Sequence, residues 1–143
     1  MTVKAILLDK GSDVFTIEPA APLAAAVNLL GQRRVGAVVV TGPDRRIAGI
    51  LSERDIIRAL AEGGARMLET PVADIMTRRV VTCSERDTVA ELMERMTTGR
   101  FRHLPVVEQG RLVGIVSIGD VVKRRVEEME RDAAALQDYI RTA

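Results

Sequence analysis

Two stretches of this 143-residue chain share one pattern, and this internal repeat constrains the fold more than any other feature. GILSERD begins at Gly49 and GIVSIGD begins at Gly114, so glycine, serine and aspartate recur at matching places. The match continues upstream, where Leu23 aligns with Val89. A unit of about 65 residues is therefore present twice, and repeated units of this kind bury their apolar faces against each other.

Each copy is predicted to hold two helices and three strands. The elements of the first copy are a short strand at 14–17, a helix opening at Pro22, strands at 35–40 and 46–51, and a second helix. Those of the second copy are a short strand at 80–83, a helix opening at Asp87, strands at 101–107 and 111–116, and a second helix. We predict an α/β (α+β) fold of two β-α-β-β-α repeats packed about a pseudo-two-fold axis.

The domain limits follow from the repeat. We predict a first repeat with its N-terminal lead-in over 1–66, a second repeat over 67–125 and a C-terminal helical extension over 126–143. The segment that precedes the first strand of each repeat, called its lead-in, is also repeated. Val3, Ile6 and Leu7 of the first lead-in correspond to Val72, Ile75 and Met76 of the second.

Composition excludes several classes of function. The 21 basic and 20 acidic residues nearly cancel, so net charge indicates no partner. The aromatic content of 2% is too low for a base-stacking nucleic-acid surface. Cys83 is the only cysteine, which excludes an internal disulfide and fits a reducing cytoplasm. No apolar run is long enough for a signal peptide or a membrane span, so we expect a cytoplasmic protein with no membrane and no nucleic-acid partner.

Motifs for catalysis are absent from the sequence. There is no phosphate-binding GxxxxGK[ST] loop, no GxGxxG and no HExxH. His103 is the only histidine, and one histidine without a cysteine or acidic cluster cannot fill a metal coordination sphere. We therefore expect no catalytic residues, no metal site and no enzymatic activity.

The repeated Ser-x-x-Asp turn has two interpretations. In the first, Ser52 and Ser117 cap a helix together with Asp55 and Asp120, which is a common structural role. In the second, the helix N-terminus and the serine hydroxyl bind a phosphate, while the aspartate accepts hydrogen bonds from two ribose hydroxyls. Gly49 and Gly114 would then let a ligand approach the strand backbone.

The tandem β-α-β-β-α pattern, the Gly-x-x-Ser-x-x-Asp turn in both copies and the stretch RHLPVVEQGRLVGIVSIGDVV resemble a CBS-domain pair, the regulatory Bateman module. The resemblance covers positions 1 to about 125. It implies a module for energy sensing or similar regulation, which binds AMP, ADP, ATP, NAD(H) or S-adenosylmethionine between its repeats. It also implies a homodimer in the form of a flat disc, and an effector protein that the chain does not identify.

The resemblance implies a set of nucleotide-binding residues in two clefts. The first cleft would contain Thr16, Arg102, His103, Ser117 and Asp120. The second cleft would contain Thr82, Ser52, Arg54 and Asp55. We expect the first cleft to be the better AMP-type site, because the first repeat has uncharged Gly36 and Ala37 where the second has Arg102 and His103.

The C-terminal sequence predicts one long helix with a heptad seam. Its apolar positions step by four and three: Val122, Val126, Met129, Ala133, Leu136 and Ile140. The seam either packs back on its own module or pairs with a second chain, and both alternatives stay open from sequence. An alternative function is a dimeric interaction scaffold whose ligand clefts are vestigial.

Overall fold

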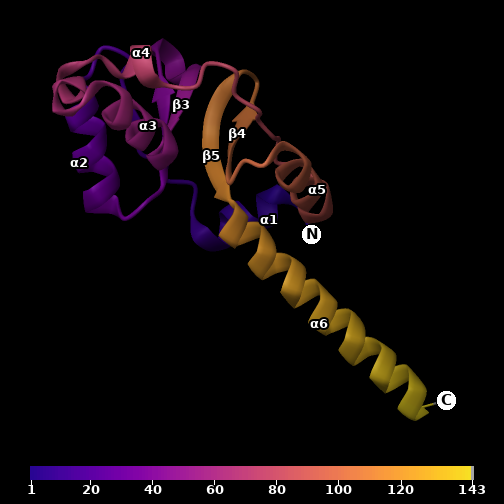
Figure 1. The fold of residues 1–143 in the computed structure, drawn as a ribbon. Coiled ribbons are helices and arrows are strands. Elements are labelled where there is room, and N and C mark those ends of the chain that lie inside the picture. Colours follow the sequence, from indigo (N-terminus) through magenta and orange to yellow (C-terminus); the bar gives the residue numbers. More distant parts are fainter. Residues whose placement is uncertain (143) are drawn as a thin grey trace.

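The computed structural model describes residues 1–142 and contains the two predicted repeats (Figure 1). The first region contains α1 (Val3–Lys10), β1 (Thr16–Ile17), α2 (Leu23–Arg33), β2 (Ala37–Thr41), η1 (Pro43–Arg45), β3 (Ile47–Ser52), α3 (Glu53–Gly63) and η2 (Ala65–Glu69). The second contains α4 (Val72–Ile75), α5 (Val89–Gly99), β4 (His103–Glu108), β5 (Arg111–Ser117) and α6 (Ile118–Thr142).

The central strands of the two repeats have the same register. β2 and β3 pair antiparallel with Ala37 opposite Ser52, and β4 and β5 pair antiparallel with His103 opposite Ser117. Each hairpin has one register shift near its turn. The fold prediction is confirmed, since both copies place their Ser-x-x-Asp turn where the last strand passes directly into a helix.

The two lead-ins are exchanged between the repeats. Thr2 in the first lead-in forms a bridge with Thr88, which precedes α5 of the second repeat, and Pro71 in the second lead-in forms a bridge with Pro22, which precedes α2 of the first repeat. Backbone hydrogen bonds reinforce the exchange, for example from Val3 N to Asp87 O at 2.9 Å. These reciprocal contacts relate the halves by the expected pseudo-two-fold symmetry. The limits 1–66 and 67–125 remain predictions.

Each apolar core is completed by the lead-in of the other repeat. Val3 and Ile6 of α1 are buried among residues of α5, β4 and β5, and Val72 and Met76 are buried among residues of α2, β2, β3 and α3. The four side chains are between 0% and 8% exposed. Burial of a large aliphatic side chain contributes roughly 2 kcal/mol, so neither core is complete without the other half of the chain.

Two local predictions differ from the structure. The strand expected at 80–83 is reduced to a single parallel bridge from Cys83 to Val106, so the second sheet has two strands and the first has three. The helix expected to open at Asp87 begins at Val89, because Thr88 is the N-cap residue and forms a capping box with Glu91.

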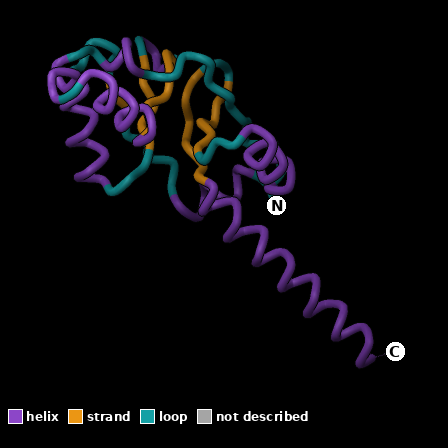
Figure 2. The backbone as a smooth tube through the Cα atoms, in the orientation of Figure 1, coloured by secondary structure: helices purple, strands orange, loops and turns teal. Residues whose placement is uncertain are grey.

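The C-terminal residues form one long helix, as the sequence predicts, and this helix, α6, extends away from the body of the molecule (Figures 1 and 2). Its 25 residues make it roughly 37 Å long. α5 packs on its first turns, where Val121 is fully buried. From Met129 to Thr142 every residue is exposed. The extension predicted over 126–143 is helical as far as Thr142, and Ala143 lies outside the described residues.

Candidate functional site

The Ser52 turn is a closed capping arrangement. The Asp55 carboxylate accepts hydrogen bonds from Ser52 N at 3.0 Å and Ser52 Oγ at 3.1 Å, and Asp55 N donates to Ser52 Oγ at 3.3 Å. The Thr77 hydroxyl, in the segment that follows α4, reaches both carboxylate oxygens at 3.3 and 3.4 Å. Arg58 lies 3.8 Å from Oδ1. Both oxygens of the Asp55 carboxylate therefore have partners inside the protein, and the side chain is only 10% exposed.

The Ser117 turn repeats the capping bonds but has a different third partner. Asp120 Oδ2 accepts from Ser117 N at 2.9 Å and from Ser117 Oγ at 3.0 Å, and Asp120 N donates to Ser117 Oγ at 3.2 Å. Lys10, the last residue of α1, donates from its ammonium group to the same Oδ2 at 2.7 Å and also to Ile115 O at 3.1 Å. No sequence pattern indicates Lys10, because only the exchange of the lead-ins brings it to this turn.

The Asp120 turn therefore keeps a carboxylate oxygen that has no partner among the described residues, which the Asp55 turn does not. Every described hydrogen bond to the Asp120 carboxylate ends on Oδ2, which leaves Oδ1 without a partner among residues 1–142. Ile118 N donates to Arg102 O, but Gly119 N has no bond among the described backbone bonds. A Cβ added at Gly119 would contact only Ser117 Oγ, at 3.6 Å, so this stretch of backbone is accessible. An acceptor and a helix N–H donor lie within one turn of each other.

Charge also distinguishes the two turns. Burial acts to raise the pKa of the Asp120 carboxyl, but the hydrogen bonds from Lys10 and Ser117 outweigh burial and hold the pKa below its usual value. Burial lowers the pKa of His103, which lies among Glu53, Lys10, Arg102 and Asp120. The imidazole is therefore mostly neutral at pH 7, beside two permanent cations.

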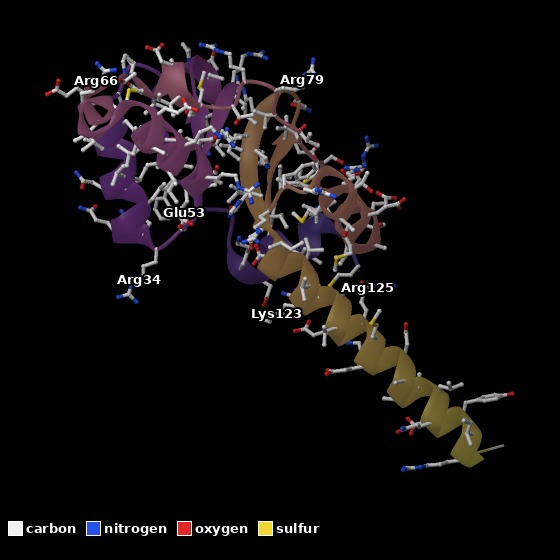
Figure 3. The ribbon with its side chains drawn as sticks, viewed as in Figure 1. Arg34, Glu53, Arg66, Arg79, Lys123 and Arg125 are labelled. Atoms are coloured by element: carbon white, nitrogen blue, oxygen red, sulfur yellow. The ribbon has the colours of Figure 1, made fainter. Side chains whose placement is uncertain are left out.

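His103 lies where the two repeats meet. A Cβ added at Gly36 would be 3.4 Å from the His103 ring and 3.7 Å from the Glu53 carboxylate, so these three residues are neighbours. Figure 3 labels Glu53 at the start of α3. The predicted correspondence of Gly36 with Arg102 agrees with the structure, because Glu53 N donates to Gly36 O just as Ile118 N donates to Arg102 O.

Two predicted site residues, Thr16 and Thr82, lie apart from the Ser-x-x-Asp turns. Thr16 is half-buried in β1 opposite Val39, and no described hydrogen bond links it to the Ser117 turn. Thr82 lines a pocket of about 390 Å³ with Arg46 and Arg78. That pocket lies at the hairpin end of the sheets and Asp55 does not line it. Arg54 is exposed on α3. The structure thus gathers Arg102, His103, Ser117 and Asp120 around one turn and Ser52, Arg54 and Asp55 around the other, and it leaves Thr16 and Thr82 apart from both.

The interpretation of Gly49 and Gly114 as points of ligand approach is corrected by the structure. A Cβ at Gly49 would lie 2.6 Å from Met76 Sδ and 2.8 Å from Thr77 O, and a Cβ at Gly114 would lie 2.7 Å from Leu7 Cδ2. Both glycines make room for the exchanged lead-ins, so a glycine is needed at these positions for packing rather than for ligand contact.

Residues 1–142 contain no group of three or more His, Cys, Asp or Glu side chains placed to hold a metal ion. Within the same range, none of the helices has the length and apolar character needed to cross a membrane.

Two interlocked β-α-β-β-α units with a Ser-x-x-Asp turn at each sheet end define a tandem-repeat module. The family model described as the CBS domain matches residues 3–62 and 72–127, so the chain belongs to the CBS-domain family and forms a CBS pair. The CBS domain-containing protein CBSX3, mitochondrial, of Arabidopsis thaliana is 39% identical over 119 residues, which are 80% of this chain and 58% of that protein. The chain therefore spans little more than half the length of this relative, and about a quarter of other Arabidopsis relatives.

Solved structures show the same fold. The CBS-domain containing protein ATU1752 of Agrobacterium tumefaciens superposes with a TM-score of 0.84 at 49% identity, covering 87% of this chain and 99% of that chain. The CBS domain protein PAE2072 of Pyrobaculum aerophilum, solved in complex with AMP, has a TM-score of 0.75 at 30% identity and coverages of 84% and 89%. The CBS pair of MJ0100, in complex with 5′-methylthioadenosine and S-adenosylmethionine, has a TM-score of 0.79 at 25% identity and coverages of 90% and 98%.

Proposed function

We propose that this CBS pair is a regulatory module that binds an adenine nucleotide, such as AMP, ADP, ATP or NAD(H), at the Asp120 turn. The observation that carries the proposal is the carboxylate oxygen Oδ1 of Asp120, which has no partner among the described residues while both oxygens of Asp55 are engaged. The complexes of PAE2072 with AMP and of MJ0100 with adenosine derivatives support an adenosine ligand.

Each part of the nucleotide has a counterpart in the site. Ribose hydroxyls would donate to Asp120 Oδ1, and the phosphate would accept from Gly119 N at the N-terminus of α6, where the helix dipole favours an anion. Ser117 Oγ could also donate to the phosphate once its hydroxyl proton turns away from Asp120 Oδ2, to which it donates in the free structure. Lys10 and Arg102 supply positive charge for that phosphate. Thr16 remains a candidate for the base or sugar. Ser52, Arg54 and Asp55 form the weaker candidate site, because the Asp55 carboxylate is already satisfied. Thr82, predicted for the same site, lines a separate pocket.

The link from Asp120 to Lys10 offers a route for the signal. A ligand that draws Lys10 onto its phosphate would release the 2.7 Å bond between the α1 lysine and the α6 aspartate. The two helices would then have different contacts in the free and bound states, and only such a difference lets a ligand shift a conformational equilibrium. CBS-domain proteins are generally regulatory rather than catalytic, and we propose that an effector protein reads this change.

Thermal and urea unfolding with AMP, ATP, NADH and S-adenosylmethionine tests the proposal. A ligand at 100 times its Kd should add about 2.7 kcal/mol to the free energy of unfolding. We expect Asp120→Asn to abolish the gain and the matched Asp55→Asn variant to retain it. The proposal fails if the Asp120 variant responds like the parent protein, or if none of the four ligands stabilises the parent.

A further inference from the structure

The seam of α6 leaves several large apolar side chains exposed. Val126, Met129, Leu136 and Ile140 are 47%, 54%, 60% and 65% exposed. The opposite side of the helix is held by the body, because Arg124 pairs with Asp9. A helical segment of 14 exposed residues is marginal in water on its own, so this segment needs a packing partner to remain fully helical.

The identities of the seam residues bear on the number of strands. With Val126, Ala133 and Ile140 at the a positions, the d positions are Val122, Met129 and Leu136. Two of the three a residues are β-branched and one d residue is leucine, which partly matches the composition that favours two strands.

The charged residues that flank the seam favour the parallel orientation. In a parallel pair Arg125, a g position, faces Glu130 of the partner subunit, an e position, and the two-fold axis makes this attractive contact twice. Figure 3 shows Arg125 near the end of α6 closest to the body. In an antiparallel pair over the whole seam, Glu130 would face its own copy and so would Asp132, which is repulsive. A shorter antiparallel overlap removes that repulsion but takes Leu136 and Ile140 out of the seam.

We infer that α6 pairs in parallel with α6 of a second copy of this chain, forming a two-stranded coiled coil that joins two CBS pairs side by side. The interface lies outside the nucleotide site and does not depend on its assignment. The occupant of the seam is thus another copy of this chain, and the two bodies lie at the same end of the coil.

Sedimentation equilibrium of the full chain tests the stoichiometry. The parent protein should have twice its 15.6 kDa chain mass at tens of micromolar. Leu136→Asp should raise the dimer Kd at least tenfold without changing the melting of the body, because Leu136 lies in the stretch of α6 that is exposed throughout. Arg125→Glu should raise the Kd roughly fivefold, and adding Glu130→Arg should restore it. Arg131→Glu, the same charge change at an outward f position, is the matched control.

Cysteine cross-linking tests the orientation. Ala133→Cys should form an interchain disulfide on mild oxidation, because identical a positions face each other only in the parallel pair, while the matched outward variant Ala134→Cys should not. The native thiol gives a low background, since Cys83 is buried and burial, with a smaller contribution from Asp87, raises its pKa to about 12. A monomeric parent overturns the inference. So does a dimer that Leu136→Asp leaves intact, or one that cross-links only when Val126→Cys is mixed with Leu136→Cys.

Discussion

The two Ser-x-x-Asp turns have the same capping bonds and opposite chemical character. At the first turn the third partner of the aspartate is a neutral hydroxyl, Thr77, which reaches both oxygens of a carboxylate that is 10% exposed. At the second turn the third partner is the ammonium of Lys10, which binds one oxygen of a carboxylate that is 23% exposed. One motif can therefore be a finished helix cap in one repeat and a potential binding site in the other.

The lead-ins produce this difference. Because each lead-in packs on the opposite repeat, Thr77 reaches Asp55 and Lys10 reaches Asp120. The two residues are not counterparts, since Leu8 is the residue that aligns with Thr77 when the lead-ins are matched. The strands and helices of the repeats are similar, so the specificity of each turn depends on the segment that comes from the other half of the chain.

Removing the two aspartates should separate the roles most strongly. Asp55→Ala should lower the free energy of unfolding by about 3 kcal/mol, because it leaves a buried N–H and hydroxyl groups without their acceptor. Asp120→Ala should cost about 1 kcal/mol, the usual loss for a helix cap. Urea unfolding measures both, with exposed Asp13→Ala as the control. Equal losses would mean that the two turns are structurally equivalent.

Substitution of the two packing glycines by alanine should also cost more stability in the first repeat than in the second. Gly49→Ala should cost about 2 kcal/mol, because the new methyl group meets the Thr77 carbonyl oxygen, which the backbone holds in place. Gly114→Ala should cost about 1 kcal/mol, because the Leu7 side chain can change rotamer. Urea midpoints of the two variants decide the order. A larger loss at Gly114 would mean that the Leu7 side chain yields less than the backbone at Thr77.

The pH dependence of stability should report on His103. Burial lowers the pKa of His103 in the folded state, and Lys10 and Arg102 act in the same sense against Glu53 and Asp120. The unfolded chain therefore binds more protons as pH falls below the ordinary value of 6.5, so stability should fall with pH until the folded-state pKa is passed. Unfolding titrations between pH 8 and 5 should show this slope in the parent and a smaller slope in His103→Gln. An unchanged slope in His103→Gln would mean that the pKa of His103 does not cause this pH dependence.

Lys10→Met should have the smallest effect on stability and a selective effect on binding. The Lys10–Asp120 pair is partly exposed, so its loss should cost less than about 1 kcal/mol. If Lys10 serves the phosphate, the variant should reduce the preference for AMP over adenosine, measured by calorimetry. Ser52→Ala in the first turn serves as the comparison, and it should leave that preference unchanged.

Much of the fold was predictable from the internal repeat of the sequence. The apolar periodicity, the strand-to-helix turns and the long α6 helix were all confirmed, since each depends on residues close together in sequence. The grouping of Arg102, His103, Ser117 and Asp120 was implied by the family resemblance, and the pairing of β4 with β5 explains why His103 and Ser117 are neighbours. Lys10 and Thr77 were not predictable, because no local pattern reveals that α1 and α4 exchange places. The nucleotide-binding roles of the predicted residues remain predictions.

The exchange of lead-ins also bears on how such a chain arises and how it can be divided. A polypeptide of one half alone would expose a core that lacks Val3 and Ile6, or Val72 and Met76, and would carry an arm fitted to a sister molecule. Two such polypeptides would satisfy each other by trading arms. A gene duplication that joins them end to end preserves every one of those contacts, and we expect that the halves, expressed separately, are stable only when mixed.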